Sequence, residues 1–295
     1  MIVERKDRVL ILTPVKDAED YLDGYFESLY RLTYPHHLIS IAFLESDSSD
    51  ETYGKLLGRL PELEKGFRSA AVWKKDFGFR IPEGTPRWAG YLQRERRSVL
   101  AKSRNHLLFR ALGDEDWVLW LDVDIVEYPP EIIERLLAKG KDIVQPNCVR
   151  EYGGESFDLN AWRDRGRLHL HDLRGEGDLV RLDSVGGTML LVRADIHREG
   201  LVFPSYPYGA GNPLTRRRLF PHVRQALSAL FTRGVEGKAS KLGDSMRNVR
   251  RGDILRLAEV RSGGELETEG LAMMAHDMGY QCWGMPDLEI RHAPT

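Results

Sequence analysis

The stretch from Trp117 to Val126 constrains this chain most, because it reads as a buried apolar strand that delivers two carboxylates to its end. The acidic residues are Asp122 and Asp124, two positions apart. Side chains alternate along a regular strand, so this spacing would send both carboxylates to the same side. Carboxylate oxygens suit Mg²⁺ or Mn²⁺ bridging phosphate groups. The stretch therefore predicts a metal and diphosphate site, with an acidic turn after a buried strand as the alternative.

The length and composition of the chain exclude a disordered protein. It has 295 residues, of which 42% are hydrophobic, enough for one large domain. Cys148 and Cys282 make neither a disulfide framework nor a zinc site, which favours a reducing compartment. The sequence shows no signal-peptide pattern and no apolar run approaching about 18 residues. We therefore expect a cytoplasmic protein, peripheral to a membrane at most.

Apolar runs and helical patterns alternate through the first 150 residues. Val9 to Pro14 reads as a buried strand that proline stops, and the stretch from Asp20 to Leu32 has helical spacing. This alternation predicts an α/β fold with a mostly parallel central sheet, helices on both faces and ligands at the carboxyl ends of the strands. The further expected strands are 38–44, 70–73, 117–126 and 142–146, and the helices are 51–60, 94–112 and 131–138.

We expect one domain, residues 1–295, with a nucleotide-binding half, 1–150, and an acceptor-side half, 151–295. The second half is less regular, with a glycine turn and strand over 184–192 and a helix over 267–279. Two short strands are expected near the end, at 281–283 and 288–290. The region of about 209–264 looks like an insertion between a strand end and the helix.

The insertion is strongly basic, although the whole chain has a formal net charge of −2. Between Pro213 and Arg256, eleven Lys and Arg residues face three acidic residues, a net charge of +8 that leaves −10 for the remainder. Leucine, valine and phenylalanine residues at helical spacing among these cations fit an interfacial helix on anionic lipid. A solvated lid and a contact in a homo-oligomer fit as well. Because the cations cluster with aliphatic rather than stacking aromatic residues, we expect no nucleic-acid partner.

Two further sets of residues are candidates for binding a nucleotide and its sugar. The end of the first strand should hold the base and ribose, because ligands of such sheets bind at strand ends. Asp47, in the loop after the second strand, is expected to receive a base or ribose edge, or to cap a helix, or both. Gly186 and Gly187 should let the backbone approach the transferred sugar, with a plain turn as the alternative. The candidates at the end of the first strand are Thr13, Pro14, Val15 and Asp17.

Seven sequence blocks occur in the order found in one known family. They are Leu12 to Asp17, Leu32 to Pro35, Ala101 to Asn105, Trp117 to Pro130, Lys141 to Cys148, Asp183 to Thr188 and Glu267 to Gly270. With these blocks the chain resembles the fungal mannan-polymerase glycosyltransferases of the Anp, Mnn and Van type. The resemblance spans nearly the whole chain except the basic insertion.

The resemblance implies a fold and an activity that spacing alone does not give. The family is similar in fold to the GT-A nucleotide-sugar transferases, and its members use GDP-mannose with a divalent cation, usually Mn²⁺, and transfer with retention. We therefore expect a metal-dependent mannosyltransferase acting on a saccharide, glycolipid or small hydroxyl acceptor, with Mn²⁺ or Mg²⁺ as cofactor. Fungal members carry an N-terminal transmembrane helix in the Golgi that this sequence does not show. A mannan acceptor and a Golgi address are therefore not carried over.

The metal ligands are expected in the acidic pair and near the C-terminal end of the chain. Glycosyl transfer builds negative charge on the leaving diphosphate, which a bound metal neutralises. Asp124 is the first choice as a direct ligand, whereas Asp122 binds the metal directly or through water, or contacts the sugar or ribose. His292 resembles the histidine that the family places after its last strand, and neutral imidazole suits Mn²⁺. The alternative for His292 is a surface histidine near a frayed end.

The resemblance also places Arg104 beside the donor phosphates or sugar, where an arginine fork suits phosphate oxygens. Its neighbours Arg96 and Arg97 are expected to be solvated. In GT-A enzymes an acidic residue at the position of Glu269 faces the acceptor or sugar, although a carboxylate at a helix start gains from the macrodipole in any case. The expected catalytic residues are Asp122, Asp124, Glu269 and Arg104. Asn105, Asp122 and Val123 complete the expected donor site.

Two other functions stay open at this stage. The first is a GT-A transferase with another GDP- or UDP-hexose donor, and the second is a non-catalytic subunit of a glycosyltransferase complex. The intact acidic pair argues against the second.

Overall fold

The computed structural model describes residues 7–81, 84–85, 89–209 and 264–294. Contacts divide the chain into two units, Met1–Ser205 with Leu266–Thr295, and Tyr206–Glu265. The second unit coincides closely with the predicted insertion, and the lipid, lid and oligomer hypotheses for its basic stretch fall outside the described residues. The predicted boundary at residue 150 stays a prediction. Of the helices that are described, none is long and apolar enough to cross a membrane.

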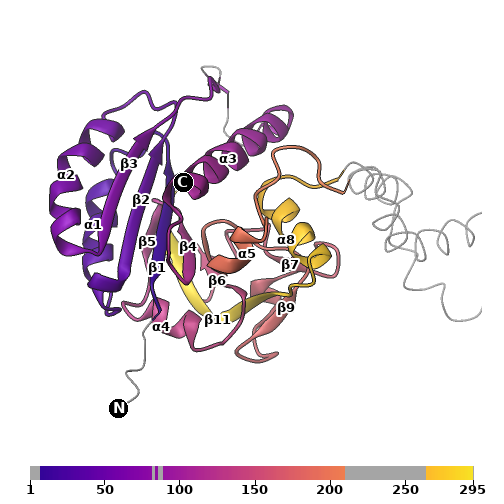
Figure 1. Cartoon of the computed structure of the whole chain (residues 1–295). Helices are drawn as coiled ribbons and strands as arrows, with labels where there is room; N and C mark the ends of the chain where they lie inside the picture. The colour runs from indigo at the N-terminus through magenta and orange to yellow at the C-terminus, as the bar shows by residue number, and fades with distance from the viewer. Residues whose placement is uncertain (1–6, 82–83, 86–88, 210–263, 295) are drawn as a thin grey trace, which may run out of the picture. The chain divides into compact units, whose positions relative to one another are not determined.

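A nine-stranded mixed sheet forms the centre of the first unit (Figure 1). Its strands are β1 (Val9–Val15), β2 (Ile39–Glu45), β3 (Ser69–Lys74), β4 (Trp117–Leu121), β5 (Ile125–Glu127), β6 (Ile143–Val149), β9 (Val180–Leu182), β10 (Met189–Arg193) and β11 (Cys282–His292). The order is β3-β2-β1-β4-β10-β6-β11-β5, with β9 also paired to β11. Strands β1 to β4 are parallel to one another, and β11 is parallel to β6. Strands β10, β5 and β9 run antiparallel to their neighbours. The other six strands run in one direction, so the predicted mostly parallel α/β sheet is confirmed.

Helices cover both faces of the sheet, because its central strands are apolar on both sides. In β1, Val9 and Ile11 join a core with one set of helices, whereas Leu10 and Leu12 join a core with the other. This split follows from the alternation of side chains along a strand. The first set is α1 (Leu22–Tyr30), α2 (Thr52–Gly66) and α4 (Ile132–Leu137), and the second is α3 (Gly90–Ala111), α5 (Ala194–Arg198) and α8 (Glu267–Asp277) (Figure 1).

The smaller elements complete the first unit. Strands β7 (Trp162–Arg163) and β8 (Leu168–His169) form a separate antiparallel pair. Two short 3-10 helices are η1 (His36–Leu38) and η2 (Leu170–Leu173). The less regular half expected after residue 150 therefore contains a hairpin.

Three predicted boundaries were wrong. Strand β1 continues through Pro14 to Val15. Helix α2 continues through Pro61 to Gly66, and this proline lies on the exposed face of the helix. The two short strands expected near the end are one strand, β11, whose register shifts between Met285 and Glu289.

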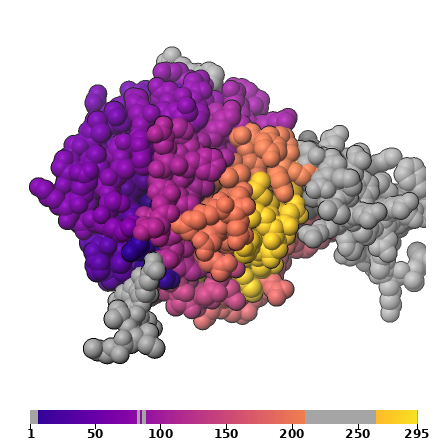
Figure 2. Space-filling model, viewed as in Figure 1, coloured from indigo at the N-terminus to yellow at the C-terminus, as the bar shows by residue number. Residues whose placement is uncertain are grey.

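Segments far apart in the sequence meet beside α8. Figure 2 shows the surface around residues 194–205 in orange against the yellow surface of the α8 region. The backbone N–H of Glu267 donates to the carbonyl of Pro204 at 2.9 Å. The chain therefore leaves the first unit and re-enters it at neighbouring points.

Candidate active site

The acidic pair lies in a turn rather than in a strand. Strand β4 ends at Leu121, and residues 122–124 turn the chain into β5. The turn is fixed from two sides, because the N–H of Asp122 donates to the Thr188 carbonyl at 2.9 Å and the N–H of Ala293 donates to the Asp124 carbonyl at 2.8 Å. The sequence had suggested that strand alternation sets the directions of the two carboxylates. In the structure it does not. Backbone hydrogen bonds from distant segments hold the turn instead.

A cleft of about 360 Å³ opens beside this turn. Asp122, Val123 and Asp124 line it, as do Pro14, Val15 and Asp17 from the end of β1. These six residues were predicted at the site, and the structure brings them together. The cleft also has lining residues that sequence reasoning missed: Lys16, Ala18, Tyr21, Ser46, Phe79, Ile81, Arg96, Val99, Leu100 and Ser103.

One face of α3 forms a wall of the cleft. Arg96, Val99, Leu100 and Ser103 recur at helical spacing and all line it. This spacing is visible in the sequence and could have identified the wall. The expectation that Arg96 is simply a solvated helical residue was therefore incomplete.

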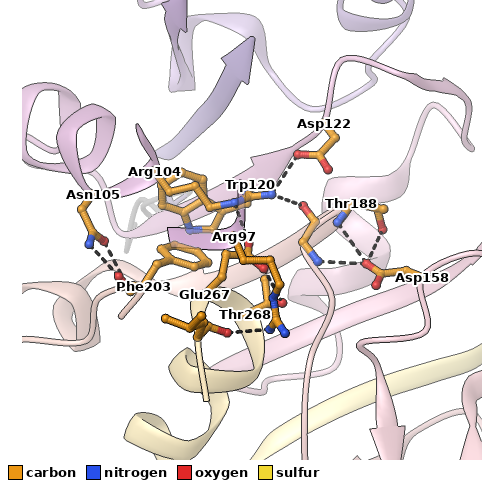
Figure 3. A network of polar contacts seen from close by, with 12 residues as sticks. Arg97, Arg104, Asn105, Trp120, Asp122, Asp158, Thr188, Phe203, Glu267 and Thr268 are labelled. Atoms are coloured by element: carbon orange, nitrogen blue, oxygen red, sulfur yellow. Dashed lines mark hydrogen bonds and ion pairs between the residues drawn. The ribbon is translucent and has the colours of Figure 1, made fainter. Parts of the chain in front are cut away.

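Arg104 lies behind this wall and is 1% exposed. Its Nη2 is 3.0 Å from Asp122 Oδ1 and donates to the Gly187 carbonyl at 3.2 Å, and its Nε is 3.1 Å from Glu267 Oε1 (Figure 3). The guanidinium also lies 5.5 Å from the ring centroid of Trp120. Arg104 is absent from the lining of the cleft and holds carboxylates, and its expected role at the donor phosphates stays a prediction.

A stacked pair continues the site at the end of β11. His292 Nε2 lies 3.1 Å from Asp124 Oδ2, and His292 Nδ1 is bonded to the Ala293 carbonyl at 2.7 Å. The His292 ring stacks on Phe157 at 3.7 Å between centroids, a neighbour that no sequence pattern indicated. Burial lowers the pKa of His292, but the hydrogen bond to Asp124, the charges of Asp124 and Asp122 and the contact with the Ala293 carbonyl together outweigh burial and leave the pKa above its usual value. His292 is 6% exposed, so the alternative of a frayed surface histidine was wrong.

Asp158 is a buried carboxylate that sequence reasoning missed. Its Oδ2 accepts hydrogen bonds from the N–H of Gly187 at 2.9 Å and from the N–H and hydroxyl of Thr188 at 3.3 and 3.2 Å (Figure 3). A Cβ at Gly186 would lie 1.9 Å from this oxygen, and a Cβ at Gly187 would lie 2.6 Å from Arg104 Nη2. The two glycines therefore make room for the protein's own charged side chains, and their expected approach to the transferred sugar stays a prediction.

We call Arg104, Asp122, Asp124, Asp158, Glu267 and His292 the charged cluster. In it Arg104 interacts with Asp122, Glu267 and Asp158, and His292 pairs with Asp124. Burial raises the pKa of Asp122 to about 7; Arg104 opposes the rise, while Asp124, Glu267 and Asp158 add to it. The Asp122 side chain keeps 28% of its surface exposed, so solvent tempers this effect. Burial also raises the pKa of Asp158. The crowded carboxylates thus favour a bound proton or an added cation at Asp122.

Helix α8 supplies two glutamates with different partners. Glu269, the expected acceptor-binding residue, has its Oε2 2.7 Å from Arg97 and accepts a hydrogen bond from the Trp162 indole at 3.1 Å. Arg97 is therefore an ion-pair partner rather than the solvated residue expected. Glu267, not predicted, contacts Arg104 and has a backbone φ of +54°. Such a φ is uncommon outside glycine, which indicates that surrounding contacts hold it there.

Three other predicted residues face away from the cleft or are committed to backbone partners. Thr13 is fully buried and its hydroxyl is bonded to that of Tyr25 at 2.6 Å. The Asn105 side chain is bonded at both ends to the backbone of Phe203, at 2.7 and 2.8 Å. Asp47 accepts hydrogen bonds from two backbone amides after β3 and caps no helix. The roles expected for Thr13, Asn105 and Asp47 in binding the nucleotide stay predictions.

The donor set at the turn fits a metal ion in part. Asp124 and His292 place a carboxylate oxygen and an imidazole nitrogen side by side, and the Nδ1 contact of His292 leaves Nε2 for a ligand. Within residues 7–81, 84–85, 89–209 and 264–294, no group of three His, Cys, Asp or Glu side chains is arranged to hold a metal. A metal here would need further oxygen ligands, which phosphate groups and water provide for Mg²⁺ and Mn²⁺.

Residues 1–173 and 166–207 match the model of the Anp1 family. The chain is 32% identical over 247 residues to the mannan polymerase II complex ANP1 subunit of Saccharomyces cerevisiae, covering 70% of this chain and 49% of that protein. It is 26% identical over 335 aligned positions to the mannan polymerase complex subunit MNN9 of Candida albicans, covering 98% of this chain and 76% of that protein. The chain thus spans about half the length of the first relative.

Among solved structures, a crystal structure of GalNAc-T7 with UDP, GalNAc and Mn²⁺ aligns with a TM-score of 0.53 at 11% identity, over 99% of this chain and 44% of that chain. A likeness at this identity shows the fold alone. With it the predicted GT-A fold is confirmed.

Proposed function

Since this chain belongs to the Anp1 family, we propose that it is a metal-dependent glycosyltransferase that transfers mannose from GDP-mannose, with retention, to a saccharide, glycolipid or small hydroxyl acceptor. Family membership and the GT-A fold support a glycosyl transfer. The choice of GDP-mannose and of retention comes from the sequence resemblance.

The single observation that carries this proposal is the acidic turn at the cleft. Asp122 and Asp124 line the same hollow as the end of β1, where a nucleotide is expected in such a sheet. The charged cluster around them has four carboxylates, one guanidinium and one imidazole. Carboxylate oxygens crowded at the edge of a cleft are suited to a divalent cation that arrives with a diphosphate.

Asp124 and His292 are the residues that would hold the metal, with Asp122 beside them. When bound, a divalent cation there would stabilise the negative charge that develops on a leaving diphosphate. Binding requires His292 to be neutral, so its ion pair with Asp124 must be given up and a proton released. The residues of this chain therefore couple metal binding to pH.

The remaining residues orient the site. Arg104 fixes one oxygen of Asp122 from the protein side, while the other side of the turn faces the cleft. Arg97 and Trp162 hold Glu269 in a fixed position at the start of α8. We retain Glu269 as a candidate for contact with the acceptor or sugar. If Glu269→Gln kept full turnover and the acceptor Michaelis constant, that role would be wrong.

A thermal-shift panel tests the proposal. The protein is melted with GDP, GDP-mannose, UDP and UDP-hexoses, each with and without Mn²⁺. We expect an Mn²⁺-dependent rise in Tm for the GDP compounds, since a ligand at 100 times its Kd adds about 2.7 kcal/mol to the free energy of unfolding. Asp124→Asn should abolish the Mn²⁺-dependent part. Asp50→Asn, outside the cleft, is the matched control and should keep it. A rise in Tm for the UDP compounds alone would show that the donor is a UDP-hexose rather than GDP-mannose.

A second candidate is a subunit that binds or transfers only within a complex. Two observations favour it: the relatives carry the word subunit in their names, and Asp122 is already paired with Arg104. No nucleotide shift for the isolated chain, together with transfer after a partner chain is added, would favour this second function.

A further inference from the structure

The side chain of Asp47, in the loop after β2, binds the segment that follows β3. Asp47 is 7% exposed, and its two oxygens accept hydrogen bonds from the N–H of Phe77 at 2.9 Å and of Gly78 at 2.8 Å. The N–H of Asp47 donates in return to Asp76 Oδ1 at 2.9 Å. Asp47 and the segment after β3 are therefore tied in both directions.

One ammonium group closes the arrangement. Lys16 Nζ donates to the Asp47 carbonyl at 2.6 Å and to the Phe79 carbonyl at 3.2 Å. Lys16 directly follows β1, so the ends of two neighbouring strands and the loop after a third are joined at one place. We call Lys16, Asp47 and residues 76–79 the Asp47 clamp.

The clamp fixes part of the cleft wall. Phe79 and Ile81 line the cleft with Pro14, Val15 and the acidic turn, and Phe79 is 7% exposed. A loop after an edge strand has few contacts of its own to set its direction. Here the direction is set by five hydrogen bonds, of which two go to a buried carboxylate and two come from an ammonium. Bonds to charged groups are the stronger ones.

We propose that the Asp47 clamp holds Phe79 and Ile81 as an apolar wall against the nucleoside of the donor, which makes Asp47 and Lys16 positioning residues for nucleotide binding. This rests on the proposed function, because the ligand is taken to be a nucleoside diphosphate. The face of a base is apolar and is recognised by packing, so a displaced wall weakens binding without removing any direct polar contact.

The backbone makes a clean test available. Asp47 has a φ of +57° and Gly78 a φ of +73°. Asparagine tolerates this left-handed region as well as aspartate does, so Asp47→Asn adds no backbone strain. Its amide keeps one acceptor oxygen and sets an N–H₂ group against the second backbone donor. The substitution therefore removes one of the two bonds to the loop and little else.

The matched control is Asp50→Asn. Asp50 lies three residues further along the same loop, accepts hydrogen bonds from the N–H of Glu19 at 3.0 Å and of Thr52 at 3.1 Å, and does not line the cleft. Both variants thus remove the charge of a loop aspartate that binds two backbone amides, but only one of them touches the wall.

The experiment measures GDP and UDP binding in the presence of Mn²⁺ by calorimetry, together with hydrogen exchange of backbone amides. Asp47→Asn should raise the Kd of the nucleotide that binds the wild type about tenfold, since small displacements of a binding wall have large effects. The amides of Phe77 and Gly78 should lose protection in the same variant. Asp50→Asn should change the Kd less than about twofold, the size of a surface effect.

The outcomes separate this inference from the proposed function. If the wild type binds nucleotide and both variants bind equally well, the clamp does not position the wall and the inference fails alone. If Asp47→Asn weakens binding while the amides of Phe77 and Gly78 keep their protection, Asp47 acts by another route and the inference also fails. If the wild type binds neither nucleotide, the proposed function fails first and takes the inference with it.

Discussion

The charged cluster and the Asp47 clamp lie at the carboxyl ends of strands in one sheet, yet they satisfy their buried carboxylates in opposite ways. Asp47 accepts hydrogen bonds from two backbone amides, which are neutral and fixed. Asp122 faces a single guanidinium and further carboxylates, and burial among them raises its pKa to about 7. A carboxylate whose two oxygens accept hydrogen bonds from backbone amides is stable without a further partner. A carboxylate crowded by like charges is stabilised by an added cation. The difference separates an acid that holds the fold from one suited to a ligand.

The same contrast separates two buried histidines. His197 Nδ1 is bonded to the Leu201 carbonyl at 2.7 Å, and its Nε2 accepts a hydrogen bond from the Trp120 indole at 3.4 Å. These neutral partners fit an uncharged ring, and burial lowers the pKa of His197 to about 4. His292 has a carboxylate partner and a pKa above its usual value. A neutral hydrogen-bond environment thus favours the uncharged ring, and a charged one favours the protonated ring.

The largest effect should come from removing the one buried cation of the charged cluster. Arg104→Met leaves Asp122 and Glu267 buried without their partner, and we expect a loss of about 3–5 kcal/mol in the free energy of unfolding. Urea denaturation measures it. Arg59→Met is the control, because Arg59 is 46% exposed where it pairs with the exposed Asp23 and Glu62, and its loss should cost far less, since solvent screens such pairs. Equal losses in the two variants would contradict the contrast drawn above.

The next effect is a dependence of stability on pH through His197. Its folded pKa of about 4 lies below the unfolded value of 6.5, so only the unfolded state takes up a proton between them. The stability that His197 contributes is therefore present above pH 6.5 and is lost as pH falls toward 4, by about 3 kcal/mol in total. His197→Gln should lack this part of the pH profile. If the free energy of unfolding changes with pH in the same way in wild type and variant between pH 6.5 and 4, His197 does not cause this pH dependence.

The smallest change in stability is expected for Asp122→Asn. The amide oxygen can still accept the hydrogen bond from Arg104, while repulsion from the other carboxylates is relieved. Without metal, the free energy of unfolding should therefore stay within about 1 kcal/mol of the wild type. The Mn²⁺-dependent rise in Tm with nucleotide should disappear. A variant that melts like the wild type in every condition, Mn²⁺ included, would remove Asp122 from the metal site.

Much of the fold could be predicted from local sequence patterns. The buried strands around β1 are continuous apolar runs, and their helices have regular spacing, so the alternation of elements was readable. The errors occurred where local rules compete with tertiary contacts. Pro61 is tolerated because its helix face is exposed, and β11 stays one strand because β6 and β9 pair with it over most of its length.

The site was predictable only where it follows from strand ends. Pro14, Val15, Asp17 and the acidic turn could be placed by the rule that ligands bind at the carboxyl ends of parallel strands. The same rule could not place three other residues: Asp158, Glu267 and Phe157. Each contacts the site from more than 28 positions away in the sequence, and none stands at a regular helix or strand spacing from its partner. Arg104 was predicted at the site, but its pairing with Asp122 and Glu267 was not, since its burial against Trp120 and Phe203 follows no local pattern.

The hydrogen bond between Glu267 and Pro204 has a consequence for how this protein can vary. Because the chain departs and returns at adjoining points, the sheet does not constrain how many residues lie between them. A bridge between Tyr208 and Glu265 holds the two ends of that interval together. A change in the number of intervening residues is therefore expected to leave the contact between Glu267 and Arg104 in place.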